Sequence, residues 1–166
     1  MGTGGLPAEL RPQAGASRTD GAVQSHPMRL KEIAKLLDAE VLTRNADLDR
    51  EVEYAGASDL MSDVLAFTRP GSVLLTGLQS IQVVRTAEML DLKAIVFVRG
   101  KRPDANTVAL AEEMGLPLFV SRYPLYEACG ILYEAGLPGS LGTAEDHGWD
   151  HLMNNRAVRA AEGALE

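Results

Sequence analysis

The sequence predicts an α/β domain of the three-layer type, in which helices cover a largely parallel sheet built from βαβ units. Three short apolar runs predict strands, at 72–75, 94–98 and 118–120. Continuous apolar residues of this kind are typical of parallel strands that are buried on both faces. A segment with helical spacing follows each run, at 79–90, 104–114 and 125–135. This alternation of strand and helix favours right-handed crossovers between parallel strands.

The first half of the core predicts a less regular set of elements. A helix is expected over 29–38, because its apolar residues recur on one helical face. Those residues are Leu30, Ile33, Ala34 and Leu37. Ser58 or Asp59 is the predicted cap of a short helix further on. Strands are expected over 40–43 and 52–57, and the short helix over 60–67.

Capping residues mark the helices of the second half. Ser80 is the predicted N-cap of the helix over 79–90, and Asp104 caps the helix that follows. Gly115 is predicted to end that second helix, because glycine adopts the left-handed backbone that terminates helices. The buried stripe of the helix over 79–90 is expected to hold Ile81, Val84, Ala87 and Met89.

Both ends of the chain differ in character from its middle. Residues 1–27 are rich in glycine and proline and predict a disordered leader, so Met28 is a hypothetical start of the native protein. The packed α/β domain is expected over 28–138, and 139–166 is expected to be a polar, partly helical tail. That tail holds three residues with metal-ligand spacing, for which no metal is predicted because a glutamate-containing zinc motif is missing. They are His147, Asp150 and His151.

Composition narrows the classes of function. The chain has 166 residues, of which 46% are hydrophobic, and a formal charge of −7. The negative charge disfavours nucleic acid and anionic membranes as partners. The lone cysteine, Cys129, excludes an intramolecular disulfide and suits a reducing compartment, so a cytoplasmic protein is expected. No cofactor is predicted.

The loops that follow the three predicted strands form the candidate ligand site. Ligands of open parallel sheets bind beyond the carboxyl ends of the strands, where loop amides and helix N-termini meet. Hydroxyls, cations and flexible glycine backbone in these loops suit a phosphate or carboxylate ligand. The alternative is that the cations belong to a solvated surface and that Gly77 serves a tight turn. The candidate residues are Thr76, Gly77, Ser80, Arg99, Gly100, Lys101, Arg102, Ser121 and Arg122.

Catalytic motifs are missing from the sequence. It lacks the glycine-rich loops of nucleotide hydrolases and dinucleotide-binding domains, so no catalytic residue is predicted. Asp59 and Asp63 have a spacing that suits a divalent cation, but the favoured interpretation is that Asp59 or Ser58 caps the short helix and that Asp63 is exposed. Cys129 has no histidine base within 28–138 and is expected to be a small buried helix residue.

A glycine within the last predicted helix points to an interface. Gly130 costs helix stability and often marks close approach of another backbone. Tyr126 and Tyr133 lie seven residues apart and therefore share a helical face. One interpretation is a subunit interface with both tyrosines as contacts, and the other is ordinary packing onto the sheet.

Several segments together resemble the stand-alone DRTGG-domain proteins over about residues 28–137. They are Leu30-Lys31-Glu32-Ile33-Ala34, Ala57-Ser58-Asp59-Leu60-Met61-Ser62-Asp63-Val64-Leu65, the strand from Pro70-Gly71 to Thr76-Gly77, Ala94 to Pro103, and Glu127-Ala128-Cys129-Gly130. The resemblance implies a fold similar to the N-terminal domain of HPr kinase and a regulatory or dimerising role. The motif that names the family is replaced after Thr76-Gly77 by Leu78-Gln79-Ser80.

Three hypotheses of function follow. The first is a non-catalytic regulatory module that forms a homodimer and senses a phosphorylated metabolite or nucleotide. The second is a protein-interaction adaptor that docks to a partner enzyme without a small ligand. The third is a metal-dependent enzyme that uses Asp59 and Asp63 with the basic loops.

Overall fold

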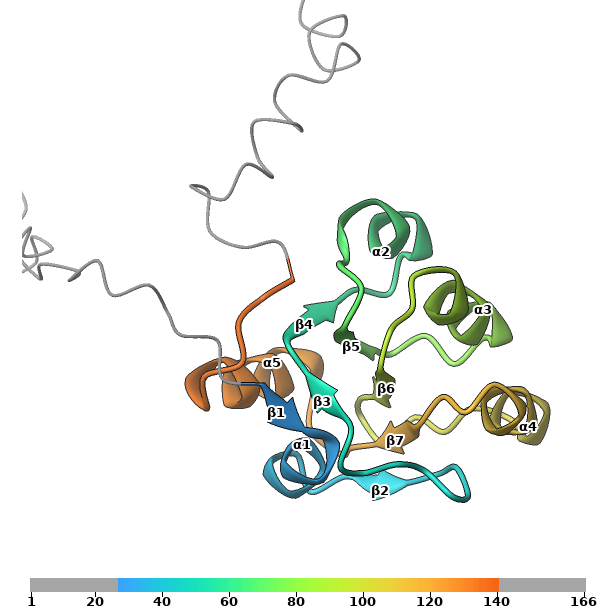
Figure 1. Cartoon of the computed structure of the whole chain (residues 1–166), viewed down its shortest axis with the longest axis horizontal. Helices are drawn as coiled ribbons and strands as arrows, with labels where there is room; N and C mark the ends of the chain where they lie inside the picture. Colours follow the sequence, from blue (N-terminus) through green and yellow to red (C-terminus); the bar gives the residue numbers. More distant parts are fainter. Residues whose placement is uncertain (1–26, 141–166) are drawn as a thin grey trace, which may run out of the picture.

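A five-stranded sheet forms the middle layer of the protein, in the computed structural model that describes residues 27–140 (Figure 1). The strand order is β2-β7-β6-β5-β4. The edge strand β2 is antiparallel to β7, and every other neighbouring pair is parallel. The predicted α/β class with a largely parallel sheet is thus confirmed. The strands are β2 (Glu40–Val41), β4 (Tyr54–Ala57), β5 (Ser72–Thr76), β6 (Ala94–Phe97) and β7 (Leu118–Val120).

Helices cover both faces of this sheet (Figure 1). One core lies beneath α1 and α5 and takes Val73 and Leu75 from β5, whereas Leu74 points into the other core. All three side chains are fully buried, as expected for a strand covered on both sides. The first layer has α1 (Leu30–Leu36) and α5 (Leu125–Glu134), and the other has α2 (Met61–Phe67), α3 (Ile81–Met89) and α4 (Ala105–Glu113).

Side-chain caps and glycine turns set the helix ends as predicted. The Ser80 hydroxyl accepts a hydrogen bond from the Gln82 N–H at 3.2 Å, and the Asp104 carboxylate accepts one from Thr107 at 2.8 Å. This bond lowers the pKa of Asp104, because it favours the charged carboxylate. Gly115 has φ +67° directly after the C-cap of α4, a conformation that glycine adopts without steric cost.

The predicted inward face of α3 is wrong in two positions. Ile81 and Met89 are 38% and 73% exposed, and Val83 is buried in their place. The helix begins at Ile81, directly after its cap, so the inward stripe is Val83, Val84 and Ala87. Ile81 is the first residue of the helix and remains exposed.

The predicted strand over 52–57 is two strands in different sheets. β3 (Glu51–Val52) pairs antiparallel with β1 (Met28–Arg29) in a separate two-stranded sheet. The Glu53 N–H donates to the carbonyl of Gly71 at 3.1 Å, and β4 then joins the main sheet beside β5. Val52 is buried beneath α1 with Met28, a pairing between residues far apart in sequence.

The predicted cap of α2 is also wrong. Its N-cap is Leu60, which makes no side-chain capping bond. The Ser58 hydroxyl accepts the N–H of Leu60 at 3.1 Å, outside the helix, and the Asp59 side chain turns toward β5. The short helix itself lies where the sequence predicts it.

The end of the described chain runs along the outer edge of β4. Ala55 donates its N–H to the carbonyl of Pro138 at 2.9 Å and accepts from the N–H of Ser140 at 2.8 Å. Gly139 forms a parallel bridge with Ala55, so contacts with the sheet continue two residues past Pro138. The leader and the His147, Asp150 and His151 cluster lie outside the described residues. Between residues 27 and 140, no helix is long and apolar enough to cross a bilayer.

Candidate functional site

A hydrogen-bonded turn follows β5 at the carboxyl end of the sheet. The Asp59 Oδ1 accepts a hydrogen bond from the Thr76 hydroxyl at 3.0 Å and another from the Gly77 N–H at 2.6 Å. The Thr76 hydroxyl oxygen in turn accepts from the N–H of Leu78 at 3.1 Å. Thr76 is fully buried, and Asp59 is exposed. One carboxylate from the connection between β4 and α2 therefore holds the turn that follows β5.

The loop after β6 brings a cation to this turn. Arg99 and Gly100 have φ +57° and +65°, and their N–H groups donate to the carbonyls of Tyr123 and Ser121 at 2.9 and 2.8 Å. A Cβ atom at Gly77 would lie only 2.6 Å from Arg99 Nη2. The guanidinium therefore lies against the Gly77 backbone, and a side chain at this position would make the flexible end of Arg99 move. We call Asp59, Thr76, Gly77 and Arg99 the strand-end cluster.

The remaining predicted hydroxyls are engaged in structural bonds. Ser121 is buried, donates to the carbonyl of Leu37 at 2.7 Å and accepts from the N–H of Tyr123 at 3.2 Å. Ser80 caps α3. These two hydroxyls serve the fold, so the strand-end cluster carries the polar groups of the candidate site.

The other predicted cations lie apart from the strand-end cluster. The Arg102 guanidinium forms a two-point ion pair with Glu40 on β2, at the opposite edge of the sheet from β4. Lys101 is exposed. Arg122 lines a separate hollow of about 260 Å³ together with Asp38 and Tyr123. Of the four predicted cations, Arg99 is the one that reaches the strand-end cluster.

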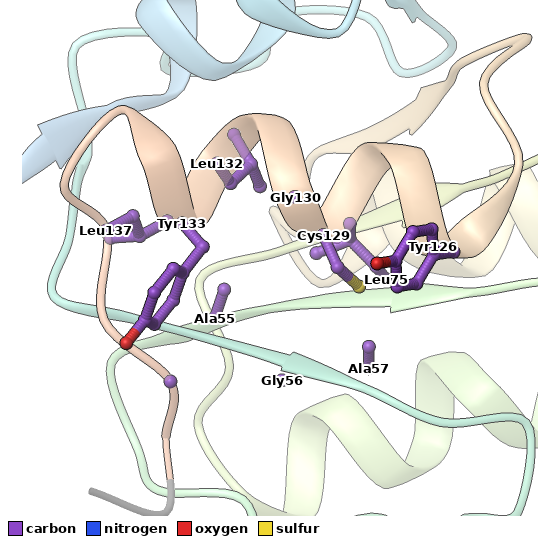
Figure 2. A pocket seen from close by; sticks show the side chains of 11 residues that line it. Ala55, Gly56, Ala57, Leu75, Tyr126, Cys129, Gly130, Leu132, Tyr133 and Leu137 are labelled. Atoms are coloured by element: carbon purple, nitrogen blue, oxygen red, sulfur yellow. The ribbon is translucent and has the colours of Figure 1, made fainter. Parts of the chain in front are cut away.

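An apolar groove of about 400 Å³ lies between α5 and the edge strand β4 (Figure 2). Tyr126 and Tyr133 stand at its two ends and are 86% and 74% exposed. We call this surface the α5–β4 groove. Its lining carries no charged side chain and consists of Ala55, Gly56, Ala57, Leu75, Tyr126, Cys129, Gly130, Leu132, Tyr133, Leu137 and Gly139.

Gly130 has no packing reason within the described chain. A Cβ atom added there would meet nothing within 4 Å among residues 27–140, other than its own helix backbone and chain neighbours. The residue is exposed, and it lines the α5–β4 groove. Ordinary packing onto the sheet therefore does not explain this glycine.

Cys129 is half-buried in the same groove. Burial raises the pKa of its thiol, because a thiolate loses hydration there. The side chain therefore favours the neutral thiol at neutral pH, as a packing residue does. Among residues 27–140, no group of three or more histidine, cysteine, aspartate or glutamate side chains is placed to hold a metal ion.

Two features of these sites escape analysis of the sequence. In the sequence, Asp59 is interpreted as a helix cap or as one of two carboxylates that could bind a divalent cation. Its hydrogen-bond partners in the structure lie 17 and 18 residues further along the chain. The strand side of the α5–β4 groove is made by small residues without polar side chains, Ala55, Gly56 and Ala57. A predicted edge strand beside a helix with spaced tyrosines is the signal that could have located it.

The fold and these sites describe a three-layer α/β domain with a polar strand-end cluster and an apolar lateral groove. The family model of the DRTGG domain matches residues 32–135. The chain therefore belongs to the DRTGG domain family, as its motifs indicate.

A solved structure shares this fold. It is the crystal structure of the CBS and DRTGG domains of the regulatory region of Clostridium perfringens pyrophosphatase, complexed with its activator diadenosine tetraphosphate. The TM-score is 0.55 at 13% sequence identity, over 71% of this chain and 51% of that chain. The present chain thus spans about half of that regulatory region. No curated protein matches the sequence.

Proposed function

We propose that this protein is a cytoplasmic, non-catalytic regulatory module that senses a small phosphorylated ligand and forms a homodimer. The observation that carries the sensing role is the position of Arg99, whose guanidinium lies against the Gly77 backbone at the carboxyl end of β5. A cation, a backbone N–H and a hydroxyl at one sheet edge are the groups that bind a phosphoryl oxygen.

Two further facts support a regulatory role. The structural relative that shares the fold is a regulatory region bound to a nucleotide activator. In the present chain, the strand-end cluster brings together a cation, a backbone N–H and a hydroxyl, which are groups that bind a phosphoryl oxygen.

The homodimer is proposed to form through the α5–β4 groove. The same surface carries projecting aromatic side chains, Tyr126 and Tyr133, and the hollow that lies between them. A surface that has both projecting side chains and a hollow to receive them is self-complementary, as a two-fold interface requires. The open space beside Gly130 leaves room for a second backbone.

Thermal unfolding with a panel of nucleotides, acyl phosphates and sugar phosphates tests the sensing role. A ligand at 100 times its dissociation constant stabilises the fold by about 2.7 kcal/mol. The stabilisation should disappear in Arg99→Gln and persist in the matched control Arg85→Gln, which changes an exposed arginine on α3. An unchanged melting temperature with every compound at millimolar concentration would refute sensing.

The extent of Cys129 alkylation tests the dimer. This is the only cysteine of the chain and it lines the groove, so labelling reports on that surface alone. Iodoacetamide should react more slowly as protein concentration rises, in parallel with a doubling of mass by light scattering. A monomeric mass and a constant labelling rate at all concentrations would remove the dimer from the proposal.

The α5–β4 groove also favours a second candidate, an adaptor that docks to a partner enzyme. Exposed tyrosines around an apolar hollow are typical of protein interfaces. Under this alternative the isolated chain is monomeric, and a purified partner enzyme protects Cys129 from alkylation. Arg99→Gln should leave that protection intact, whereas Tyr133→Ala should abolish it.

A further inference from the structure

The two donors of the strand-end cluster already hold an anion that belongs to the protein. The Gly77 N–H and the Thr76 hydroxyl both donate to one oxygen of Asp59, at 2.6 and 3.0 Å. These donors are fixed, because Thr76 is fully buried at the end of β5. A phosphoryl oxygen placed there would accept the same two bonds.

The Arg99 guanidinium also lies near the two donors that hold the Asp59 oxygen. The point where a Gly77 Cβ would lie is 2.6 Å from Arg99 Nη2 and 3.5 Å from each carboxylate oxygen of Asp59. Yet no carboxylate oxygen among residues 27–140 lies within the 4.0 Å of an ion pair with Arg99, whereas five other pairs meet that limit. The guanidinium thus lies beside the carboxylate without neutralising it in a direct pair.

The Asp59 side chain can rotate away from Thr76 and Gly77 without disturbing the backbone around it. Its side chain is exposed and lies in the short connection between β4 and α2. The connection keeps other anchors, because the Ser58 N–H donates to the carbonyl of Leu75 at 3.2 Å and the Ser58 hydroxyl accepts from Leu60. Rotation of the Asp59 side chain into water therefore leaves the backbone in place.

We propose that the Asp59 carboxylate occupies the binding position of the ligand's phosphoryl group and that a phosphorylated ligand binds by displacing it. The exchange keeps the Gly77 N–H and the Thr76 hydroxyl satisfied, and it gives Arg99 an anionic partner. Asp59 is then a built-in competitor that sets the affinity threshold of the sensor. This inference rests on the proposed sensing function and names the residue that regulates it.

Isothermal titration with inorganic pyrophosphate at constant ionic strength tests the proposal. Asp59→Asn keeps the side-chain shape and an acceptor oxygen but removes the charge. Its affinity for pyrophosphate should exceed that of the unmodified protein by about tenfold or more, since a like charge is removed from the site. Asp63→Asn removes an exposed charge in the first turn of α2, four residues further along the chain, and should leave the affinity unchanged.

Two further measurements keep the result decisive. In Asp59→Asn with Arg99→Gln, the gain in affinity should be lost. Pyrophosphate should shift the Gly77 amide resonance, and shifts confined to other loops would overturn the proposal. If Asp59→Asn fails to fold by circular dichroism, Asp59→Ser offers a smaller neutral acceptor for the same titration.

Each outcome separates the two proposals. Equal or weaker binding by a folded Asp59 variant would overturn the competitor role and leave the sensing function standing. An equal gain in Asp63→Asn would also overturn it, because a general charge effect would then explain both. Pyrophosphate binding by the Asp59 variant alone would support the competitor role. If neither protein binds pyrophosphate, the competitor role is overturned, and the thermal-unfolding panel decides the sensing function separately.

Discussion

The strand-end cluster and the α5–β4 groove differ in whether their groups find partners within the chain. In the strand-end cluster, the Thr76 hydroxyl, the Gly77 N–H and the Asp59 carboxylate are joined by hydrogen bonds. In the groove, Tyr126 and Tyr133 are largely exposed and Gly130 faces open space. A polar site without a ligand can be stabilised by internal bonds, whereas an apolar surface gains only when something covers it. We therefore expect substitutions in the groove to affect association, and those at the strand ends to affect folding or ligand binding.

Truncation of the groove tyrosines should have the largest effect. Each of Tyr126→Ala and Tyr133→Ala should raise the dissociation constant of the dimer about 30-fold, which corresponds to about 2 kcal/mol for an aromatic contact at an interface. Tyr123→Ala is the matched control, because that tyrosine lines the separate hollow beside Arg122. Sedimentation equilibrium measures the constants. Equal effects of all three substitutions would erase the distinction between the groove and the rest of the surface.

Ser121→Ala should have the next largest effect, on folding. The substitution leaves the carbonyl of Leu37 without its buried donor, so the free energy of unfolding should fall by about 1–3 kcal/mol. Urea denaturation measures the change. Ser62→Ala, at an exposed position of α2, should change it by less than about 0.5 kcal/mol. A loss of ligand binding without a loss of stability would instead place Ser121 in the ligand site.

Gly130→Ala should act with opposite signs on the two quantities. The free energy of unfolding of the monomer should rise by up to about 1 kcal/mol, because alanine is the better helix former and the added Cβ meets nothing within 4 Å. The same methyl group in the groove should weaken the dimer. Gly136→Ala is the contrasting control and should destabilise the fold, since Gly136 has φ +101°. A rise in stability with unchanged dimer affinity would exclude Gly130 from the interface.

Arg102→Gln should have the smallest effect. Its ion pair with Glu40 is about half exposed on both sides, so its loss should cost less than about 1 kcal/mol and the cost should shrink further in high salt. Binding of phosphorylated ligands should be unaffected. Weaker binding would extend the candidate site beyond the strand-end cluster toward the β2 edge.

The fold could be predicted to the extent that its signals are local. The runs at 94–98 and 118–120 correspond closely to β6 and β7, because continuous apolar residues with helices on both sides specify a covered parallel strand. The division of 52–57 into β3 and β4 could not be predicted. It depends on the antiparallel pairing of Val52 with Met28, which leaves no trace in the residues between them.

The sequence could predict where the loops of the candidate site lie, but it could not predict the hydrogen-bond and ion-pair partners of their residues. Parallel topology places the loops after β5, β6 and β7 at one edge, and Arg99 does lie against Gly77 there. Which groups remain available depends on distant residues: Leu37 engages Ser121, and Glu40 engages Arg102. Cations and hydroxyls that look equivalent in the sequence are therefore unequal in the structure.

The pairing of residues 138–140 with β4 has a practical consequence for shortened forms of the protein. The family match ends at residue 135, and a chain cut there would leave the N–H and carbonyl of Ala55 uncovered. Open strand edges beside apolar surfaces recruit strands from other molecules and lead to aggregation. A chain that extends through Ser140 retains this cover, so deletions intended for crystallisation should stop beyond it.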